Sequence, residues 1–376
     1  MFVTYTLPVK VDSVDRADFL HRLITSVREQ DFPYQKRSKK RMDWSSYDTA
    51  QCTEIADMLD LIRDLVDAAD RRVKARKATG PPGPGRPPVE AADVAKVMLA
   101  QSYLGLSNRG AEGMLILLWR NLGIKKAFSY KTIERGYDKE AVNEILDEVM
   151  DLSNEPIEGK ETTFSIDGSG TPTNVRQNYS DDRKRQNGKG KKAKDDTFPK
   201  GDRDYVYAVA VIGTRYKIFS SYQNTSEHNV SELAFVPQAV AETKALHPEM
   251  DMLCGDGYFA NRNVCKTLQD HGVTPRLLPR RNATTKRKGV FSWTQMVMEL
   301  MRDPQQWLSE YYKREASETG FSMLKLRNPG PLKKRLIPRR LTEDRLRGLI
   351  HNARRLCYLY YLEDVQTAPI LKGSNS

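Results

Sequence analysis

Four polar residues recur within one stretch that reads as helix, YYKREASETGFSMLK: Tyr311, Arg314, Glu318 and Lys325. At about 100° per residue on an α-helix, their positions place all four side chains within an arc of roughly 60°. One helical stripe therefore carries a carboxylate flanked by two cations and a phenol.

Two aspartates upstream complete a set of hard oxygen ligands. Each follows an apolar, strand-like segment and precedes a glycine, Asp167 in FSIDGSG and Asp256 in MDMLCGDGYF. Two aspartates at strand ends and a glutamate on a later helix can bring three carboxylates to one point, which suits Mg²⁺ and the chemistry of phosphate esters.

Each of these motifs also has a simpler interpretation. An Asp-Gly pair after an apolar strand is usually a turn. An Arg–Glu pair four residues apart on a helix is usually a solvated ion pair. Glu315 lies on nearly the same helical face as Glu318, so periodicity alone does not choose between the two carboxylates.

The elements that must position these residues follow Glu161. Strands are predicted over TTFSIDGSG, DYVYAVAVIG, YKIFSSYQN, DMLCGDGYF and TPRLLPRR. Helices are predicted over SELAFVPQAVAETKAL, over NRNVCKTLQDHG and in a long region from Ser292 to about Leu326. The resulting order, β-β-β-α-β-α-β-α, with acids on the first and fourth strands and the last helix, is that of an RNase H-like domain. The predicted fold class is α/β, a mixed sheet flanked by helices and preceded by an all-helical N-terminal region.

The chain before the sheet divides at a Pro/Gly-rich segment. Residues 13–35 and 43–78 read as helical, giving an N-terminal helical region over 1–78. TGPPGPGRPP, residues 79–88, fits neither a helix nor a central strand, and we interpret it as a linker. A basic turn beside DNA, using Arg86, is the alternative.

Residues 89–155 form a second helical block that resembles a helix-turn-helix. Ser107 is expected to cap one helix, and Ser129 to begin another over SYKTIERGYDKEAVNEILDEVMDLS. A recognition helix exposes polar residues at its N-terminus in this way, so Tyr130, Lys131 and Arg135 are candidate DNA contacts. The alternative is an ordinary helical bundle.

Composition narrows the class of protein. The 376 residues include 61 Lys and Arg against 49 Asp and Glu, a formal charge of +12, which favours a polyanionic partner such as nucleic acid. The four cysteines show no CxxC pairing, and the five histidines are scattered, which argues against a zinc site or a disulfide framework. No signal peptide or membrane span is predicted. The expected location is the cytoplasm, with association with the nucleoid through bound DNA.

In the light of these motifs, the chain resembles the DDE transposases of prokaryotic insertion sequences that carry the signature Tyr-x2-Arg-x3-Glu-x6-Lys. Tyr311, Arg314, Glu318 and Lys325 match that spacing without a gap. The resemblance covers residues 160–362 as the catalytic domain. Only 62 positions separate Asp256 from Glu318, which leaves little room for the β-rich insertion that some relatives carry there.

The resemblance implies a site and its cofactor. Asp167, Asp256 and Glu318 would be the catalytic triad and would hold divalent ions, two Mg²⁺ with Mn²⁺ able to substitute. Arg314 and Lys325 would contact DNA phosphates, and Tyr311 would stack on a base or bond a phosphate.

The implied function is transposition, meaning metal-dependent cleavage of mobile-element ends in double-stranded DNA and strand transfer into target DNA. The alternatives are an RNase H-like nuclease without strand transfer and a non-catalytic DNA-binding remnant or regulator. A homodimer on paired ends is expected. An apolar stripe through Ile55, Leu59, Ile62 and Leu65 would serve either a dimer interface or the chain's own core.

Two basic stretches flank the presumed site. The first, between the first two strands, has the composition of a loop, either a solvated loop or a DNA contact, and includes Lys189, Lys191 and Lys192. The second runs from Lys325 to Arg355, where a helix near Thr342 is expected to bury leucines and to present arginines outward to phosphates. Residues 363–376 are expected to be a flexible tail.

Overall fold

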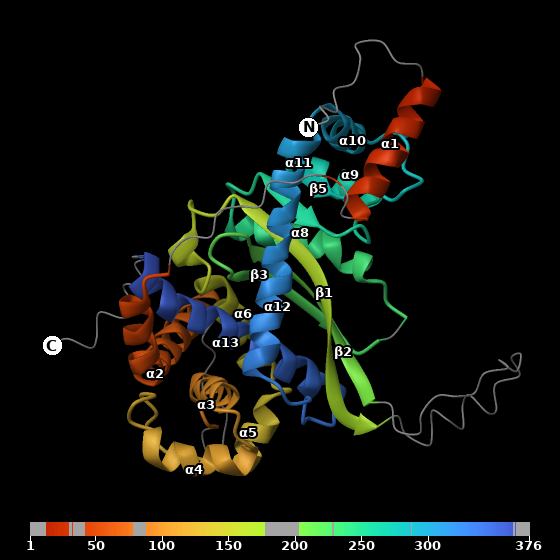
Figure 1. Cartoon of the computed structure of the whole chain (residues 1–376). Helices are drawn as coiled ribbons and strands as arrows, with labels where there is room; N and C mark the ends of the chain where they lie inside the picture. The colour runs from red at the N-terminus through yellow and green to blue at the C-terminus, as the bar shows by residue number, and fades with distance from the viewer. Residues whose placement is uncertain are drawn as a thin grey trace, which may run out of the picture.

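A mixed sheet forms the centre of the chain (Figure 1), in a computed structural model that describes residues 13–29, 32, 42–77, 88–176, 203–227, 229–286, 288–363 and 365. Within these residues the sheet has five strands in the order β3-β2-β1-β4-β5. The central strand β1 pairs antiparallel with β2 and parallel with β4. At the two edges, β3 is antiparallel to β2 and β5 is parallel to β4. The strands are β1 (Thr163–Arg176), β2 (Arg203–Gly213), β3 (Phe219–Thr225), β4 (Met252–Gly255) and β5 (Thr274–Leu277).

The order of elements from β1 to α12, here called the sheet half, confirms the predicted RNase H-like α/β fold. The short turn η2 (Glu232–Phe235) and α8 (Val236–Leu246) connect β3 to β4, and α9 (Arg262–Asp270) connects β4 to β5. The long helical region after β5 is divided into α10 (Phe291–Arg302), α11 (Pro304–Tyr311), the 3₁₀ turn η3 (Tyr312–Arg314) and α12 (Glu315–Arg327). The first break follows from Pro304 at the start of α11, where the Asp303 side chain accepts a hydrogen bond from the Gln306 N–H.

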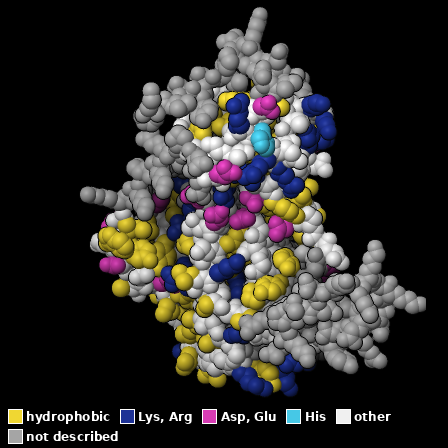
Figure 2. Space-filling model, turned by 45° about the vertical axis from the view of Figure 1, so that its right-hand side comes forward, with side chains coloured by type: hydrophobic (Ala, Val, Ile, Leu, Met, Phe, Trp, Pro, Cys, Tyr) yellow, Lys and Arg dark blue, Asp and Glu magenta, His cyan; other side chains and the backbone are white. Residues whose placement is uncertain are grey.

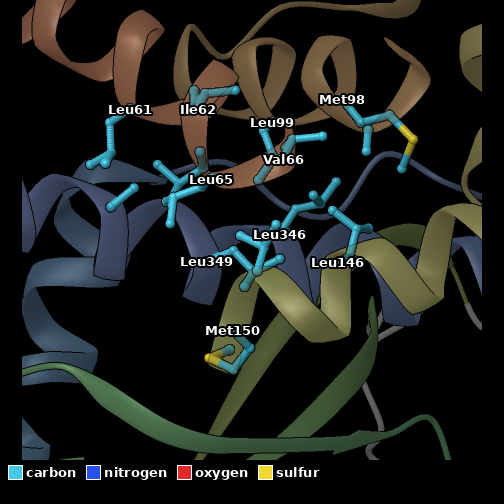
Figure 3. Close-up of a cluster of buried hydrophobic side chains, with 14 of the residues drawn as sticks. Leu61, Ile62, Leu65, Val66, Met98, Leu99, Leu146, Met150, Leu346 and Leu349 are labelled. Carbon is cyan, nitrogen blue, oxygen red and sulfur yellow. The ribbon is translucent and has the colours of Figure 1, made fainter. Parts of the chain in front are cut away.

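The two faces of the sheet are covered by two separate hydrophobic cores. Successive side chains of a strand point to opposite faces, so Ala208, Ala210 and Ile212 of β2 join one core while Val209 and Val211 join the other. Figure 3 shows the first core, where leucines, methionines and valines of four helices point toward one another. These helices are α2 (Trp44–Arg76), α3 (Ala91–Tyr103), α6 (Glu140–Leu152) and α13 (Ile337–Glu363).

The second core joins α1 (Ser13–Arg28) to the sheet half of the chain. Leu20, Leu23, Ile24 and Val27 of this helix are buried together with side chains of α8, α9, α10 and α11. Figure 1 accordingly shows α1 beside α9 and α10, far from α2. Within the described residues, the N-terminal region contains the helices α1 and α2, and these pack into different cores.

The apolar stripe of α2 serves the chain's own core. Leu59, Ile62 and Leu65 are buried against α3, α6 and α13, whereas Ile55 is 61% exposed. Of the two roles considered for this stripe, packing within the chain accounts for three of its four residues.

The block before the sheet differs from the predicted helix-turn-helix. Ser107 caps α4 (Asn108–Leu118) as expected, its Oγ accepting from the Gly110 N–H at 3.1 Å. The chain then needs residues 119–129 to reach α5 (Tyr130–Gly136), whereas a helix-turn-helix turn takes three or four. Ser129 precedes α5 without a side-chain capping bond, and the Tyr130 N–H donates instead to Glu112 Oε2 at 3.0 Å.

The predicted single helix after Ser129 is two helices, α5 and α6. The chain turns inward at Tyr137, which is buried and donates its hydroxyl to Gln101 Oε1 of α3 at 3.1 Å. Gly136 lies so close to α3 that an added Cβ would stand 2.3 Å from Val94 Cγ1. A short 3₁₀ turn, η1 (Glu155–Ile157), leads from α6 to β1. Within the described part of the chain, no helix combines the length and apolar character that crossing a membrane requires.

Candidate active site

The pairing of β1 with β4 brings the two aspartates together. These strands are parallel, and Ile166 is paired with Gly255. Asp167 is the next residue of β1 and Asp256 is the first residue after β4, so they lie at equivalent positions along two adjacent strands. The Asp256 carboxylate accepts a hydrogen bond from the Tyr258 N–H at 2.8 Å, and Asp167 accepts one from the Gly168 N–H at 2.9 Å.

Helix α12 lies over β1 and β2, on the face of the sheet to which the Asp167 side chain belongs. Ser165, two residues before Asp167 and therefore on the same face, donates to the Arg314 carbonyl at 3.0 Å and lies 2.9 Å from Ser317 Oγ. Gly320 permits the close approach, because a Cβ there would stand 2.3 Å from Ile212 Cδ1 of β2. The start of α12, which carries Glu318, is thus fixed opposite Asp167.

The pKa of Asp167 reflects its surroundings. Burial, together with the negative charges of Asp256 and Glu318, raises this pKa to about 6. The Gly168 N–H and the Arg314 guanidinium oppose this rise. The charge of Glu318 contributes to the raised pKa of Asp167, which favours Glu318 over Glu315 as the third carboxylate.

Arg314 holds the Glu318 side chain. Its guanidinium forms an ion pair with the Glu318 carboxylate, which is 53% exposed. In this arrangement, no three His, Cys, Asp or Glu side chains among the described residues lie close enough to share one metal ion. Figure 2 shows one face of the molecule on which acidic side chains gather near the middle, with Lys and Arg side chains directly above them.

Tyr311 is a core residue, contrary to the expectation that it would stack on a base. Its side chain is 4% exposed, and its ring stacks on Trp307 with centroids 5.3 Å apart. In a 3₁₀ turn, side chains three residues apart are eclipsed, which places Arg314 Cζ 5.4 Å from the centre of the Tyr311 ring. Burial raises the pKa of the Tyr311 hydroxyl to about 12. Lys325, by contrast, is exposed near the end of α12, as a phosphate contact requires.

Two further side chains lie beside the aspartates and were missed in the sequence. Glu232 of η2 places its carboxylate against Gly168, where an added Cβ would stand 2.6 Å from it, on the face opposite Asp167. Arg28, the last residue of α1, lies beside Gly257, where an added Cβ would stand 2.5 Å from Arg28 Nη2. Neither belongs to a motif, and only the tertiary packing of η2 and α1 brings them here.

The C-terminal basic segment is largely engaged within the chain, contrary to the expectation of outward arginines. Helix α13 buries its leucines as predicted, but many of its cations, and Lys334 before it, form ion pairs with distant carboxylates. These pairs are Lys334 and Arg339 with Glu134, Arg339 with Asp138, Arg340 with Asp204, Arg345 with Asp147 and Arg354 with Glu54.

The other candidate DNA contacts are divided. Lys131 and Arg135 are exposed on α5, while Tyr130 is half-buried with the Arg109 guanidinium 5.3 Å from its ring centre. The basic loop with Lys189, Lys191 and Lys192 lies outside the described residues, as do residues 79–87 of the linker and 366–376 of the tail.

Comparison with known proteins places this arrangement in a family. Residues 158–362 match the family described as Transposase DDE domain. The chain is also 27% identical over 338 residues to the probable transposase for insertion sequence element ISA1214 of Archaeoglobus fulgidus. That similarity covers 89% of this chain and 92% of the relative. The matched family region begins just before β1 and ends within the last turn of α13, so it contains all three carboxylates.

Proposed function

This chain belongs to the Transposase DDE domain family, and from that premise we propose that it cuts the ends of its own mobile element and joins them to target DNA. Transposases act on DNA, and DDE transposases generally use divalent metal ions. One observation supports the finer assignment most directly: Asp167 and Asp256 directly follow the paired residues of two parallel strands, and α12, which carries Glu318, is hydrogen-bonded to β1 beside Asp167 through Ser165 and Ser317.

We assign the metal site to Asp167, Asp256 and Glu318. The donors suit Mg²⁺ or Mn²⁺, because all are carboxylate oxygens and because burial, together with the charges of Asp256 and Glu318, raises the pKa of Asp167, an effect that a bound divalent cation opposes. Glu318 turns toward Arg314 in the structure, so the site as assigned requires a change of its side-chain rotamer. When bound at these residues, divalent ions would supply activation of the attacking hydroxyl and stabilisation of the leaving oxygen of a phosphodiester.

The neighbouring residues are assigned to binding and orientation. Arg314 neutralises Glu318 here and, when Glu318 turns away, presents a planar guanidinium to a phosphate. Tyr311 positions Arg314 through its buried ring and does not itself contact DNA. Lys325 contacts phosphates further along the duplex, and Lys131 and Arg135 contact the end sequence.

We further propose that two chains act on two paired ends, because each chain carries one such site and one element has two ends. Light scattering of the full chain with end duplexes would show two chains with two duplexes. One chain per duplex at all concentrations, with cleavage retained, would contradict the pairing.

The proposed function is tested with the full chain, Mg²⁺ and a duplex that carries the terminal repeat of the element. Wild-type protein should nick the end and, given a second duplex, produce a joined strand. Asp167→Asn and Asp256→Asn should abolish both products while leaving DNA binding within about threefold, because the carboxylates hold ions and cations supply most of the affinity. Nicking without any joined product would favour a nuclease.

A further inference from the structure

A cavity of about 520 Å³ opens directly beside Asp256. Its described lining consists of Asp256, Gly257 and Tyr258 on one side and three arginines, Arg28, Arg280 and Arg281, on the other. Arg28 comes from α1, more than two hundred residues away along the chain. A cavity that begins at a presumed catalytic carboxylate and is otherwise walled by guanidinium groups is suited to a polyanion that leads away from the reacting phosphate.

A larger cavity of about 750 Å³ adjoins the first and shares Arg280 with it. Its cations are Arg262, Arg280 and Lys288, its other polar side chains include Asn282 and Thr284, and no acid is among the described residues that line it. Across both cavities, five cations face a single carboxylate, Asp256. The excess of positive charge therefore extends from the cavity beside Asp256 into the second cavity.

The cations that line the two cavities differ from those of α13 because most of them have no ion pair with a described carboxylate. Arg28 gives one hydrogen bond, from Nη2 to the Pro279 carbonyl at 3.1 Å, and neither it nor Arg280 has an ion pair with a described carboxylate. Arg262 is held in position by bonds to Thr284 and Lys286 and by the Trp293 ring, whose centre lies 4.8 Å away. Arg281 is the exception, since it pairs with Glu29 at 3.0 Å.

We propose that these two cavities form one channel for the DNA backbone beside the cleaved bond, with Arg28 and Arg280 as the phosphate contacts nearest to Asp256. Helix α1 is thereby one wall of the substrate channel, which explains why an N-terminal helix packs on the sheet half with its terminal arginine at Gly257. The channel rests on the proposed function for its position next to the cut, but the charge contacts are testable without any cleavage.

The first test measures binding of the full chain to a fluorescent, non-specific 30-base-pair duplex between about 50 and 300 mM salt without metal. Arg28→Ala combined with Arg280→Ala should weaken binding at least about tenfold and reduce the slope of log affinity against log salt by about 1.8, since each lost phosphate contact contributes about 0.9. Lysine at both positions should restore the slope. Both arginines are exposed, so folding should survive, as a thermal melt would confirm.

The matched control removes two exposed cations of the same half that line neither cavity, by Arg22→Ala on α1 with Lys266→Ala on α9. If this pair lowers the affinity and the slope as much as the Arg28 and Arg280 pair does, the channel is wrong and only total charge matters.

The second test places the channel relative to the cut. A photo-crosslinking residue at position 282 should capture a duplex bearing the element's end within a few nucleotides of the cleaved bond. Capture only at distant nucleotides, or none, would overturn the assignment. A protein that shows the predicted salt slope and capture but never cleaves would contradict the proposed function and leave the channel intact.

Discussion

Asp167 shows how the surroundings of a single residue can point to a binding site. It is a strand residue at the centre of a sheet, where a carboxylate normally carries an unfavourable burial cost. Burial raises its pKa, the charges of two further carboxylates add to the rise, and the Gly168 N–H and the Arg314 guanidinium oppose it. An arrangement that works against its own ionisation is typical of a place where a cation or a proton is meant to bind.

Tyr311 provides a test of the difference between a DNA contact and a positioning residue. Tyr311→Phe keeps the ring on Trp307, so we expect a loss of stability of only about 1 kcal/mol and DNA affinity within about twofold of wild type. Tyr311→Ala empties a buried aromatic position and should cost about 3–5 kcal/mol. Denaturant unfolding and duplex binding measure the two effects. A tenfold loss of DNA affinity in Tyr311→Phe, with stability unchanged, would show that the Tyr311 hydroxyl contacts DNA.

At the scale of elements, α12 and β1 form one rigid unit. Ser165 and Ser317 join them by hydrogen bonds, and Gly320 allows the helix to lie close on β2. The signature spacing in the sequence therefore reflects a real constraint, because residues of α12 can meet Asp167 only if the helix is held at this depth.

Gly320→Ala tests that depth. Alanine favours a helix interior by about 1 kcal/mol over glycine, but the new Cβ overlaps the buried Ile212 side chain, an overpacking that costs about 1–3 kcal/mol. We expect a small net loss of stability and a fall in end cleavage of about tenfold, because α12 and Glu318 must move outward.

Gly113→Ala on α4 is the matched control, since that glycine is also helical but has open space around it. It should stabilise the protein by up to about 1 kcal/mol and leave cleavage unchanged. Equal rates for the two variants would show that the position of α12 does not limit the reaction.

The sequence predicts the elements of the sheet half well, because strand and helix periodicity is strong there and the order of elements is characteristic. It predicts less about the ends of helices. The break at η3 leaves no mark in the helical stripe, since an offset of three residues lies on one face in a 3₁₀ turn as well as in an α-helix. The split between α5 and α6 depends on Tyr137 finding Gln101, a contact made only by tertiary packing.

At the scale of the whole molecule, ion pairs between distant segments decide which cations are left for DNA. The sequence does not show these pairs. A run of arginines from one segment reads as a DNA surface, yet Arg345 finds Asp147 and Arg354 finds Glu54, partners on α6 and α2. Arg28 of α1, in contrast, belongs to no motif in the sequence, yet it lies beside Gly257 at the proposed active site. Which cations remain available for DNA is settled by the fold, because pairing depends on contacts between distant segments.

The stability of the contact between α13 and β3 should depend on pH through His351 of α13. Its ring is buried 4.8 Å from the Phe219 ring centre, and Nε2 donates to the Lys217 carbonyl at 2.8 Å, so burial lowers its pKa to about 4. The unfolded chain binds this proton near pH 6.5 and the folded chain does not. The contribution of His351 to the free energy of unfolding is therefore complete above about pH 6.5. It is lost as the pH falls toward 4, by on the order of 1–3 kcal/mol.

Denaturant unfolding between pH 4 and 8 measures this loss. His351→Gln retains a donor for the Lys217 carbonyl but cannot titrate, so its stability should depend less on pH across that window. An unchanged pH profile in His351→Gln would assign the acid sensitivity to other groups.

A comparison of Glu318→Gln with Glu315→Gln tests whether Glu318 completes a metal site with Asp167 and Asp256. Both residues lie in the first turn of α12, both are exposed, and both substitutions keep the shape of the side chain. The measurement is the rate of Mg²⁺-dependent nicking of an element-end duplex by each full-length variant. We predict a fall of more than about a hundredfold for Glu318→Gln and a change within about threefold for Glu315→Gln. Wild-type nicking by Glu318→Gln, or a greater loss in Glu315→Gln, would contradict the assignment.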